Sequence, residues 1–268
     1  MQAMMAAAAL WAQMAAPTPS RVLPEPTQPA ETRLAIAVGD QDYELAARVY
    51  RPAGAGPFPL AVINHGTPPD KGKLPDAKLG FARAARWFVG QGYMVVVALR
   101  PGYGSSIGRY LEAAGTCRTE DFVAAGRKTA AIEGAIVTAA SALPGVDPRR
   151  IVVVGQSAGG YGAVALADAP PPGVVAVVSF AGGRGSNGKE TICAGEDRLI
   201  AAEKTLGAAN RLPQLWLYAA NDHFFRPDLA HRMAAAYAGA SAPPVTFVDL
   251  PPFGDDGHKT LAQADPSV

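Results

Sequence analysis

The stretch RRIVVVGQSAGGYGAVALAD, residues 149–168, decides the fold. Its first half contains an apolar run without polar alternation, which is typical of a β-strand buried on both faces of a sheet. Its second half is rich in Ala and reads as a helix that begins directly after Ser157. Gly155 and Gly159 stand two residues on either side of that serine, where a Cβ atom would collide with the neighbouring strand and helix. The pattern predicts a serine in a strained turn between a strand and a helix.

A serine in such a turn is suited to nucleophilic catalysis. The turn lifts the hydroxyl above the sheet, and it leaves the next backbone N–H at a helix N-terminus. We therefore expect Ser157 to be the nucleophile and the N–H of Ala158 to stabilise an oxyanion. In a chain with 29 glycines a GxSxG match alone is weak, so its position between strand and helix carries the interpretation.

Segments with the patterns of strands and helices alternate along the rest of the chain. Short apolar or β-branched runs predict strands at residues 44–52, 60–66, 94–100, 174–183, 212–222 and 245–252. Helical periodicity predicts further helices at residues 81–93, 120–142 and 227–239. This alternation predicts an α/β fold with a mainly parallel central sheet and helices on both faces. We expect an irregular lid or binding loop at residues 184–206.

The N-terminal 30 residues differ from the rest. Residues 1–30 combine an uncharged apolar run, which ends at Pro17, with a Pro-rich stretch. The run is shorter than the roughly 20 apolar residues that span a bilayer, and it resembles the apolar part of a secretory signal without the usual preceding Lys or Arg. We expect a catalytic domain over residues 31–268 and a periplasmic or secreted protein. The alternative is an N-terminal tail on a cytoplasmic protein.

A second oxyanion donor is expected at the end of an earlier strand. INHGTP, residues 63–68, follows the apolar run of residues 60–63. The His-Gly pair permits a tight turn that would aim the N–H of Thr67 at a developing oxyanion. The alternative is an ordinary glycine turn. We assign His65 a structural role in either case.

The remaining catalytic groups follow from the order of the chain. His258 lies in a loop after the last expected strand, which brings it over the carboxyl ends of the parallel strands, so we expect it to be the base. Asp222 ends another strand and is the expected acid, which would orient the His258 imidazole. Asp255 and Asp256 are nearer in sequence, but they share the histidine loop and are better suited to forming its turn.

Residues 44–260 resemble the dienelactone-hydrolase-like branch of the α/β-hydrolases. The motif GQSAGGYGA, residues 155–163, is also similar to the corresponding turn of prolyl-oligopeptidase-type catalytic domains. The resemblance implies a Ser–His–Asp mechanism through an acyl-enzyme, no cofactor or metal, and activity on esters or, less often, amides. Dienelactone hydrolases themselves use a cysteine nucleophile, and only ten residues follow His258, so the closing helix of the family is short or missing here.

We therefore expect a serine hydrolase that cleaves small carboxylic esters. A net charge of +1 gives no electrostatic reason to expect a nucleic acid or a membrane as partner, and the oligomeric state stays open. Four aromatic residues beside the motifs are expected either to line the substrate pocket or to pack in the core: Tyr103, Tyr161, Phe224 and Phe225. The alternatives are a prolyl-oligopeptidase-like serine peptidase and a non-catalytic binding protein on the same fold.

The two cysteines follow expected strands at the same edge of the sheet. Cys117 comes after the strand at 94–100, and Cys193 comes after the strand at 174–183. Both connections leave the carboxyl ends of parallel strands, so we expect a disulfide between them on the active-site face. The bridge requires an oxidising compartment, which agrees with export.

Overall fold

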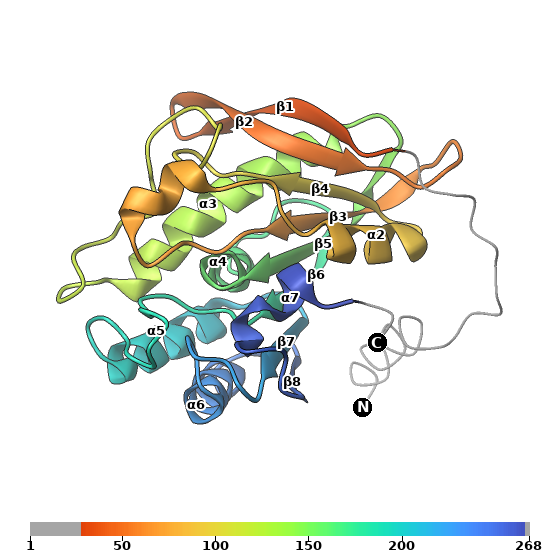
Figure 1. Ribbon diagram of the computed structural model, residues 1–268. Coiled ribbons are helices and arrows are strands. Elements are labelled where there is room, and N and C mark those ends of the chain that lie inside the picture. Colours follow the sequence, from red (N-terminus) through yellow and green to blue (C-terminus); the bar gives the residue numbers. More distant parts are fainter. Residues whose placement is uncertain (1–27, 266–268) are drawn as a thin grey trace.

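An eight-stranded sheet organises residues 28–265, the part of the chain that the computed structural model describes (Figure 1). Its strands run in the order β1-β2-β4-β3-β5-β6-β7-β8. Their bounds are β1 Ala30–Val38, β2 Gln41–Tyr50, β3 Phe58–Asn64, β4 Met94–Ala98, β5 Val146–Gln156, β6 Val174–Phe180, β7 Gln214–Ala219 and β8 Val245–Leu250. The β1–β2 and β2–β4 pairs are antiparallel and all other pairs are parallel, which confirms the predicted mainly parallel sheet.

Helices cover both faces of this sheet. Their bounds are α2 Ala82–Gly90, α3 Phe122–Ser141, α4 Ala158–Leu166, α5 Glu196–Ala209, α6 Pro227–Ala238 and α7 Thr260–Gln263, with short 3₁₀ helices η1 Lys71–Asp76 and η2 Gly257–Lys259. The apolar clusters divide them: α3, α4, α5 and α6 pack on one face, and α2 and α7 pack on the other. The predicted α/β architecture is therefore confirmed.

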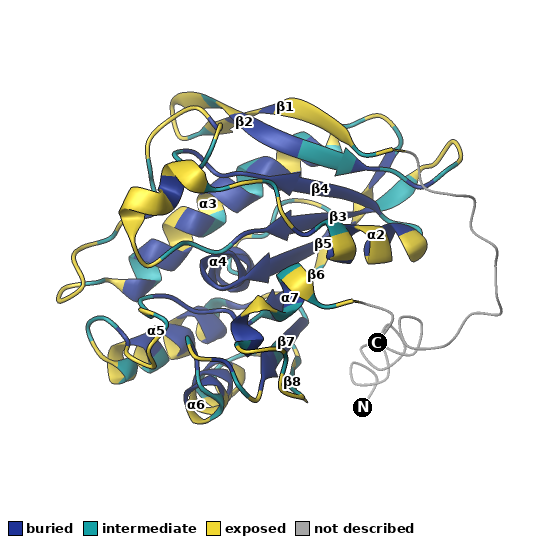
Figure 2. Ribbon diagram, viewed as in Figure 1, coloured by how far each residue is buried: buried dark blue, intermediate teal, exposed yellow. Residues whose placement is uncertain are grey.

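The central strands are buried because both of their faces are covered. Every residue of β4 is buried, and Figure 2 shows β3, β4 and β5 as a dark blue band through the molecule. Along β3, Leu60 and Val62 belong to the cluster that contains α3, whereas Ala61 and Ile63 belong to the cluster that contains α2. This two-sided burial explains why the strands read as continuous apolar runs.

Two elements differ from the sequence expectations. β1 forms a hairpin with β2, and it was not expected, although Leu34 and Ile36 show the alternate burial typical of an edge strand. The segment at 184–206 is irregular only in its first part, because α5 begins at Glu196 and buries Leu199 and Leu206. The predicted loop is thus a shorter connection followed by a helix.

The expected leader of residues 1–30 lies outside the described residues except for its last three positions. Within residues 28–265, no helix combines the length and the apolar character needed to cross a bilayer.

Candidate active site

Ser157 occupies the strained turn that its sequence context predicts. Its φ of 56° and ψ of −125° are unfavourable for a residue with a side chain, and it connects β5 directly to α4. A Cβ on Gly155 would overlap the backbone of Gly159. The turn is fixed by two hydrogen bonds, because the Ser157 N–H donates to the carbonyl of Phe180 at 3.1 Å and its carbonyl accepts from the Gly183 N–H at 3.1 Å.

The turn after β3 lies against this serine. A Cβ on Gly66 would stand 2.9 Å from the Cβ of Ser157, so only glycine allows so close an approach. Thr67 and Ala158 both line the cavity that Ser157 lines. This arrangement places the two expected oxyanion donors and the expected nucleophile on one cavity.

His65 holds this turn from behind. Its Nδ1 lies 2.7 Å from the carbonyl oxygen of Gly66, and its Nε2 accepts the N–H of Arg100 at 3.0 Å. Burial, together with the positive charge of Arg100, lowers the pKa of His65 to about 3. The ring is therefore neutral at physiological pH, with its proton on Nδ1.

Asp222 and His258 come together from separate loops. His258 Nδ1 lies 3.1 Å from Asp222 Oδ2, and the residues are 7% and 2% exposed respectively. The other carboxylate oxygen, Oδ1, accepts the N–H groups of Phe224 at 2.7 Å and Phe225 at 2.9 Å. Such bonds fix the carboxylate so that it can orient the imidazole. Asp256 instead caps η2 by accepting the His258 N–H at 3.0 Å, and Asp255 is exposed.

Two polar residues that the sequence analysis did not single out hold the histidine loop. Asn221 accepts the Phe253 N–H at 2.8 Å and donates to the carbonyl of Gly254 at 3.0 Å. Gln156, the residue before the expected nucleophile, donates its side-chain N–H to the carbonyl of His258. The position of His258 therefore depends on the ends of both β5 and β7.

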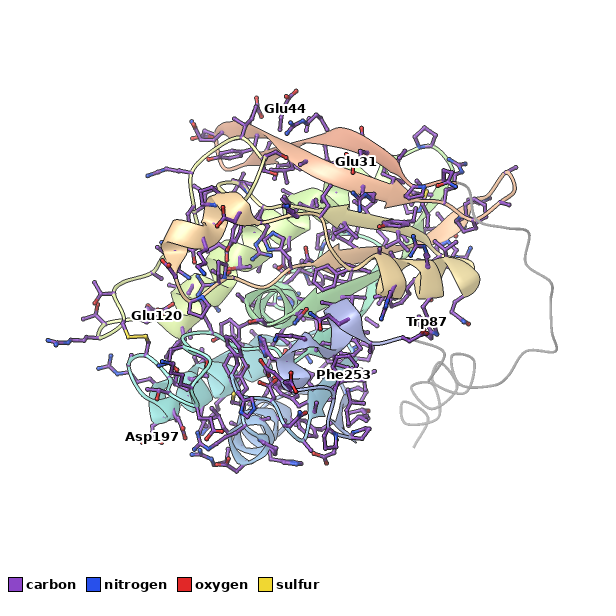
Figure 3. The ribbon with its side chains drawn as sticks, viewed as in Figure 1. Glu31, Glu44, Trp87, Glu120, Asp197 and Phe253 are labelled. Atoms are coloured by element: carbon purple, nitrogen blue, oxygen red, sulfur yellow. A yellow bond between two sulfur atoms is a disulfide. The ribbon has the colours of Figure 1, made fainter. Side chains whose placement is uncertain are left out.

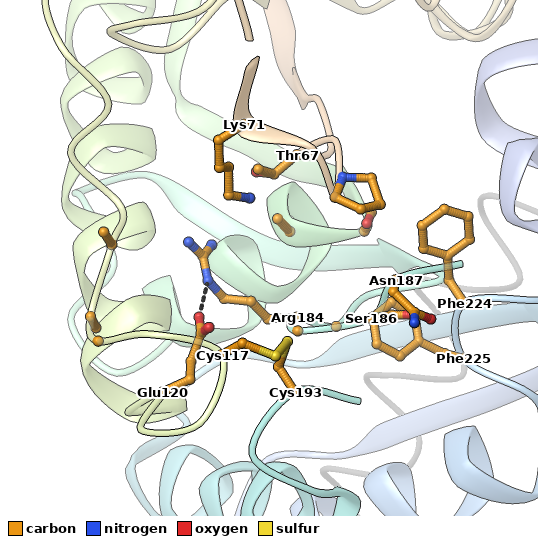
Figure 4. A pocket seen from close by; sticks show the side chains of 18 of the residues that line it. Thr67, Lys71, Cys117, Glu120, Arg184, Ser186, Asn187, Cys193, Phe224 and Phe225 are labelled. Carbon is orange, nitrogen blue, oxygen red and sulfur yellow. Dashed lines mark hydrogen bonds and ion pairs between the residues drawn. A yellow bond between two sulfur atoms is a disulfide. The ribbon is translucent and has the colours of Figure 1, made fainter. Parts of the chain in front are cut away.

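A cavity of about 380 Å³ opens beside Ser157 (Figure 4). Phe224 and Phe225 line it as expected, and the Phe224 ring stacks on the His258 imidazole with centroids 4.0 Å apart. Tyr103 and Tyr161 do not line it, which corrects the pocket expectation for these two residues. Tyr161 turns back into the α3–α4 contact, close to Gly126, and the Tyr103 hydroxyl is 2.6 Å from Thr67 Oγ1. Both are fully buried.

Charged residues from distant parts of the chain form the other side of the cavity. Arg184 lines it and pairs with Glu112 at 3.2 Å and with Glu120 at 3.1 Å. Behind it, the fully buried Arg100 pairs with Glu112 at 2.7 Å and donates to the carbonyl of His65 at 2.6 Å. A buried ion-pair network thus connects the cavity to the turn that carries Thr67.

The network sets the charge of its carboxylates. Burial alone would raise the pKa of Glu112, but Arg100 and Arg184 outweigh it and lower that pKa to about 2. Glu133 has no hydrogen-bond partner and lies 3.8 Å from Arg100. Burial raises the pKa of Glu133 well above its usual range and so favours its neutral form, whereas the two arginines favour the charged form of Glu112.

The expected disulfide is present. Cys117 and Cys193 are joined with their Cα atoms 4.7 Å apart, and both line the cavity. Figure 3 shows the yellow sulfur bond below Glu120. The bridge connects the β4–α3 connection to the irregular segment after β6, which fixes one side of the cavity covalently.

The sheet order, the strained serine between β5 and α4, and the His–Asp contact define a class of protein. Comparison with solved structures shows that the fold is that of the α/β-hydrolases. The family model that matches the chain assigns it to the serine hydrolase superfamily. The chain belongs to the family described as X-Pro dipeptidyl-peptidase (S15 family), whose model matches residues 40–242. No curated protein sequence matches the chain.

Three solved structures illustrate the similarity. Porphyromonas gingivalis dipeptidyl peptidase 4 aligns with a TM-score of 0.59 and 17% identity over 85% of this chain and 32% of its own. A Klebsiella pneumoniae subsp. pneumoniae protein described as a dienelactone hydrolase aligns with a TM-score of 0.55 and 17% identity over 89% of this chain and 92% of its own.

Acetyl xylan esterase 1 from Thermoanaerobacterium sp. aligns with a TM-score of 0.55 and 17% identity over 87% of this chain and 84% of its own. This chain therefore spans about a third of the dipeptidyl peptidase and most of the other two proteins. At these identities the similarity shows the fold. It also supports the dienelactone-hydrolase-like resemblance of the sequence.

Proposed function

We propose that this protein hydrolyses small carboxylic esters through an acyl-enzyme, with Ser157 as nucleophile, His258 as base and Asp222 as the orienting acid. The observation that carries the proposal is the buried 3.1 Å contact between His258 Nδ1 and Asp222 Oδ2. Phe224 connects this pair to the cavity, because it stacks on His258 and lines the cavity together with Ser157.

In this mechanism His258 takes the Ser157 hydroxyl proton as Oγ attacks the ester carbonyl. The N–H groups of Thr67 and Ala158 stabilise the resulting oxyanion, and losing one such donor typically costs about 100- to 1000-fold in rate. His258 then gives its proton to the leaving alcohol, which leaves an acylated Ser157. A water molecule, deprotonated by His258, hydrolyses that acyl group and restores the serine.

A serine peptidase is the second candidate, because the matching family model is that of X-Pro dipeptidyl-peptidases. One observation favours esters over peptides. The cavity presents Lys71 and Arg184, whose positive charges would disfavour the free amino terminus of a peptide substrate.

A panel of substrates separates the candidates. We expect turnover of p-nitrophenyl acetate or butyrate and little turnover of Gly-Pro or Ala p-nitroanilide. Fluorophosphonate labelling should be lost in Ser157→Ala, which serves as the blank. Preferred cleavage of Gly-Pro p-nitroanilide would support the peptidase, and the absence of both turnover and labelling would support a non-catalytic binding protein.

We also propose that the protein works in the periplasm or outside the cell, where the bridge between Cys117 and Cys193 is stable. A bridge that closes a 76-residue loop stabilises by about 4 kcal/mol in the chain-entropy model. Thiol titration of denatured, unreduced protein should find no free thiol at either cysteine. Two free thiols in protein isolated from its native host would contradict this location.

A further inference from the structure

One cation on the cavity lacks a matching anion. Lys71, at the start of η1, lines the cavity together with Thr67 and Ser157. In Figure 4, Lys71, Glu120 and Arg184 gather at one side of the view, and Phe224 and Phe225 lie at the other.

Arg184 has no hydrogen-bond capacity left for a ligand. Its Nε donates to Glu120, and its terminal nitrogens donate to the side chains of Glu112, Thr129 and Tyr110 and to the backbone carbonyl of Glu112. These contacts use all five N–H groups of the guanidinium. Arg184 therefore contributes positive charge to the cavity but no free donor.

Lys71 is in the opposite situation. Its Nζ donates to the carbonyl of Pro68 at 3.2 Å and lies 5.3 Å from the centre of the Tyr110 ring, whereas an ammonium has three donors. Among residues 28–265, no carboxylate oxygen lies within 4 Å of this nitrogen. Lys71 is exposed as a whole residue, and partial desolvation together with the positive charge of Arg184 lowers its pKa, so an anion beside it would offset the repulsion from Arg184.

The charges around the cavity also favour an anion beside Lys71. Arg100 and Arg184 form ion pairs with Glu112 and Glu120, and burial favours the neutral form of Glu133 beside Arg100. Lys71 then leaves this side of the cavity with a net positive charge. A cavity with one sign of excess charge concentrates ligands of the opposite sign.

We propose that Lys71 binds a carboxylate of the substrate, so that the preferred substrates are small esters that carry a second, free carboxylate. This inference rests on the proposed esterase function and names its substrate class. The volume of about 380 Å³ is near the lower end of ligand pockets, which span roughly 300–1,000 Å³. Lys71 lies only four positions after Thr67, so the anion would bind near the expected oxyanion site.

Matched ester pairs test the proposal. The first pair is the p-nitrophenyl monoester of glutaric acid and the same compound with its free carboxylate methylated. The second pair carries the charge on the alcohol side: 4-acetoxybenzoate and its methyl ester. We expect kcat/KM to favour the anionic member of at least one pair by roughly tenfold or more. A hydrogen bond between Lys71 and a carboxylate would stabilise the bound ester by an energy that corresponds to this ratio. The pair that responds identifies which side of the scissile bond Lys71 contacts.

Substitutions then assign the preference to one residue. Lys71→Gln should lose most of the anion preference, Lys71→Arg should retain part of it, and Lys71→Glu should reverse it. Lys73→Gln is the matched control, because Lys73, like Lys71, is exposed on η1 but does not line the cavity. The preference should also weaken at high ionic strength.

Different experimental outcomes would overturn the Lys71 proposal and the proposed esterase function. If the esters are hydrolysed but neither pair shows an anion preference, or if Lys71→Gln keeps it, the Lys71 proposal is overturned and the esterase stands. If no ester is hydrolysed, calorimetry on Ser157→Ala decides the Lys71 proposal separately. Monomethyl glutarate should then bind at least about tenfold more tightly than dimethyl glutarate, and Lys71→Gln should remove the difference. Equal binding would overturn the proposal.

Discussion

The two sides of the cavity are built in different ways. The aromatic side, Phe224 and Phe225, comes from one short connection between β7 and α6, and its backbone N–H groups hold Asp222. The charged side, Lys71, Glu120 and Arg184, is assembled from three separate connections. Buried ion pairs and a disulfide hold these connections together. Local chain geometry thus fixes the proposed acid, Asp222, whereas long-range electrostatics shape the proposed binding groups.

The largest expected effect is on kcat, and it compares the two sides by replacing one carboxylate on each side with an amide. Asp222→Asn should lower kcat by about 10⁴-fold, because an amide favours the wrong tautomer of His258. Glu120→Gln, on the charged side, should change kcat far less. Steady-state kinetics on a p-nitrophenyl ester measures both.

Two further variants control this comparison. Asp255→Asn and Asp256→Asn alter the histidine loop without removing the His258–Asp222 contact, so each should retain most of kcat. If either loses as much as Asp222→Asn, the acid lies in the histidine loop and the aromatic side does not position the base.

The next effect is on stability and concerns the charged side. Glu112→Gln leaves Arg100 and Arg184 facing each other without their shared carboxylate, which should lower the free energy of unfolding by about 3–5 kcal/mol. Glu120→Gln should cost clearly less than Glu112→Gln, because Arg184 keeps its contacts with Glu112 and Arg100 keeps its partner. Urea unfolding at neutral pH measures the free energy of unfolding of both variants. Equal decreases would contradict a stabilising role for the buried ion pairs of Glu112.

The pH dependence of the same variant sharpens the result. Glu112 has a folded pKa of about 2 and a reference pKa of 4.5, so the unfolded chain binds the proton more readily. Its stabilisation is therefore complete above about pH 4.5 and is lost as the pH falls toward 2. Glu112→Gln should flatten the acid limb of the stability profile over the range in which the protein stays folded.

The smallest expected effect returns to the aromatic side. Phe224→Leu removes the ring that stacks on His258, and such ring contacts are worth about 0.5–1.5 kcal/mol. We expect kcat to fall by roughly two- to thirteenfold, which is the rate equivalent of that energy. Phe225→Leu should lower kcat less, because its ring lies 5.8 Å from the imidazole and is tilted. The reverse order would show that stacking does not position His258.

The aromatic side and the strained turn at Ser157 could be predicted from sequence because the motifs that mark them are local. Ser157 is defined by glycines two residues away and by the strand before it. Asp222 and His258 each follow a recognisable strand, and parallel strands bring such positions to one edge of the sheet. β1 and α5 carried usable signals, alternation at Leu34 and Ile36 and helical spacing at Leu199 and Leu206, and could have been found.

The charged side could not be predicted in the same way. Glu112 and Arg184 are separated by 72 positions, and no periodicity connects them. Arg100 offered one signal, since it ends an otherwise apolar strand-like run, but its partners depend on how the following connection folds back. Tyr103 and Tyr161 were misplaced for a related reason: a position next to a motif does not determine which way a ring points.

The disulfide also divides the chain in a way that concerns cleavage. Ser157 lies inside the loop that Cys117 and Cys193 close, whereas Asp222 and His258 lie outside it. A protease that cuts one peptide bond in the exposed stretch around Lys189 would therefore leave two fragments that remain covalently attached. On a denaturing gel, the cleaved protein would migrate as one band without reductant and as two bands with reductant. The three proposed catalytic residues would stay in one covalently linked molecule.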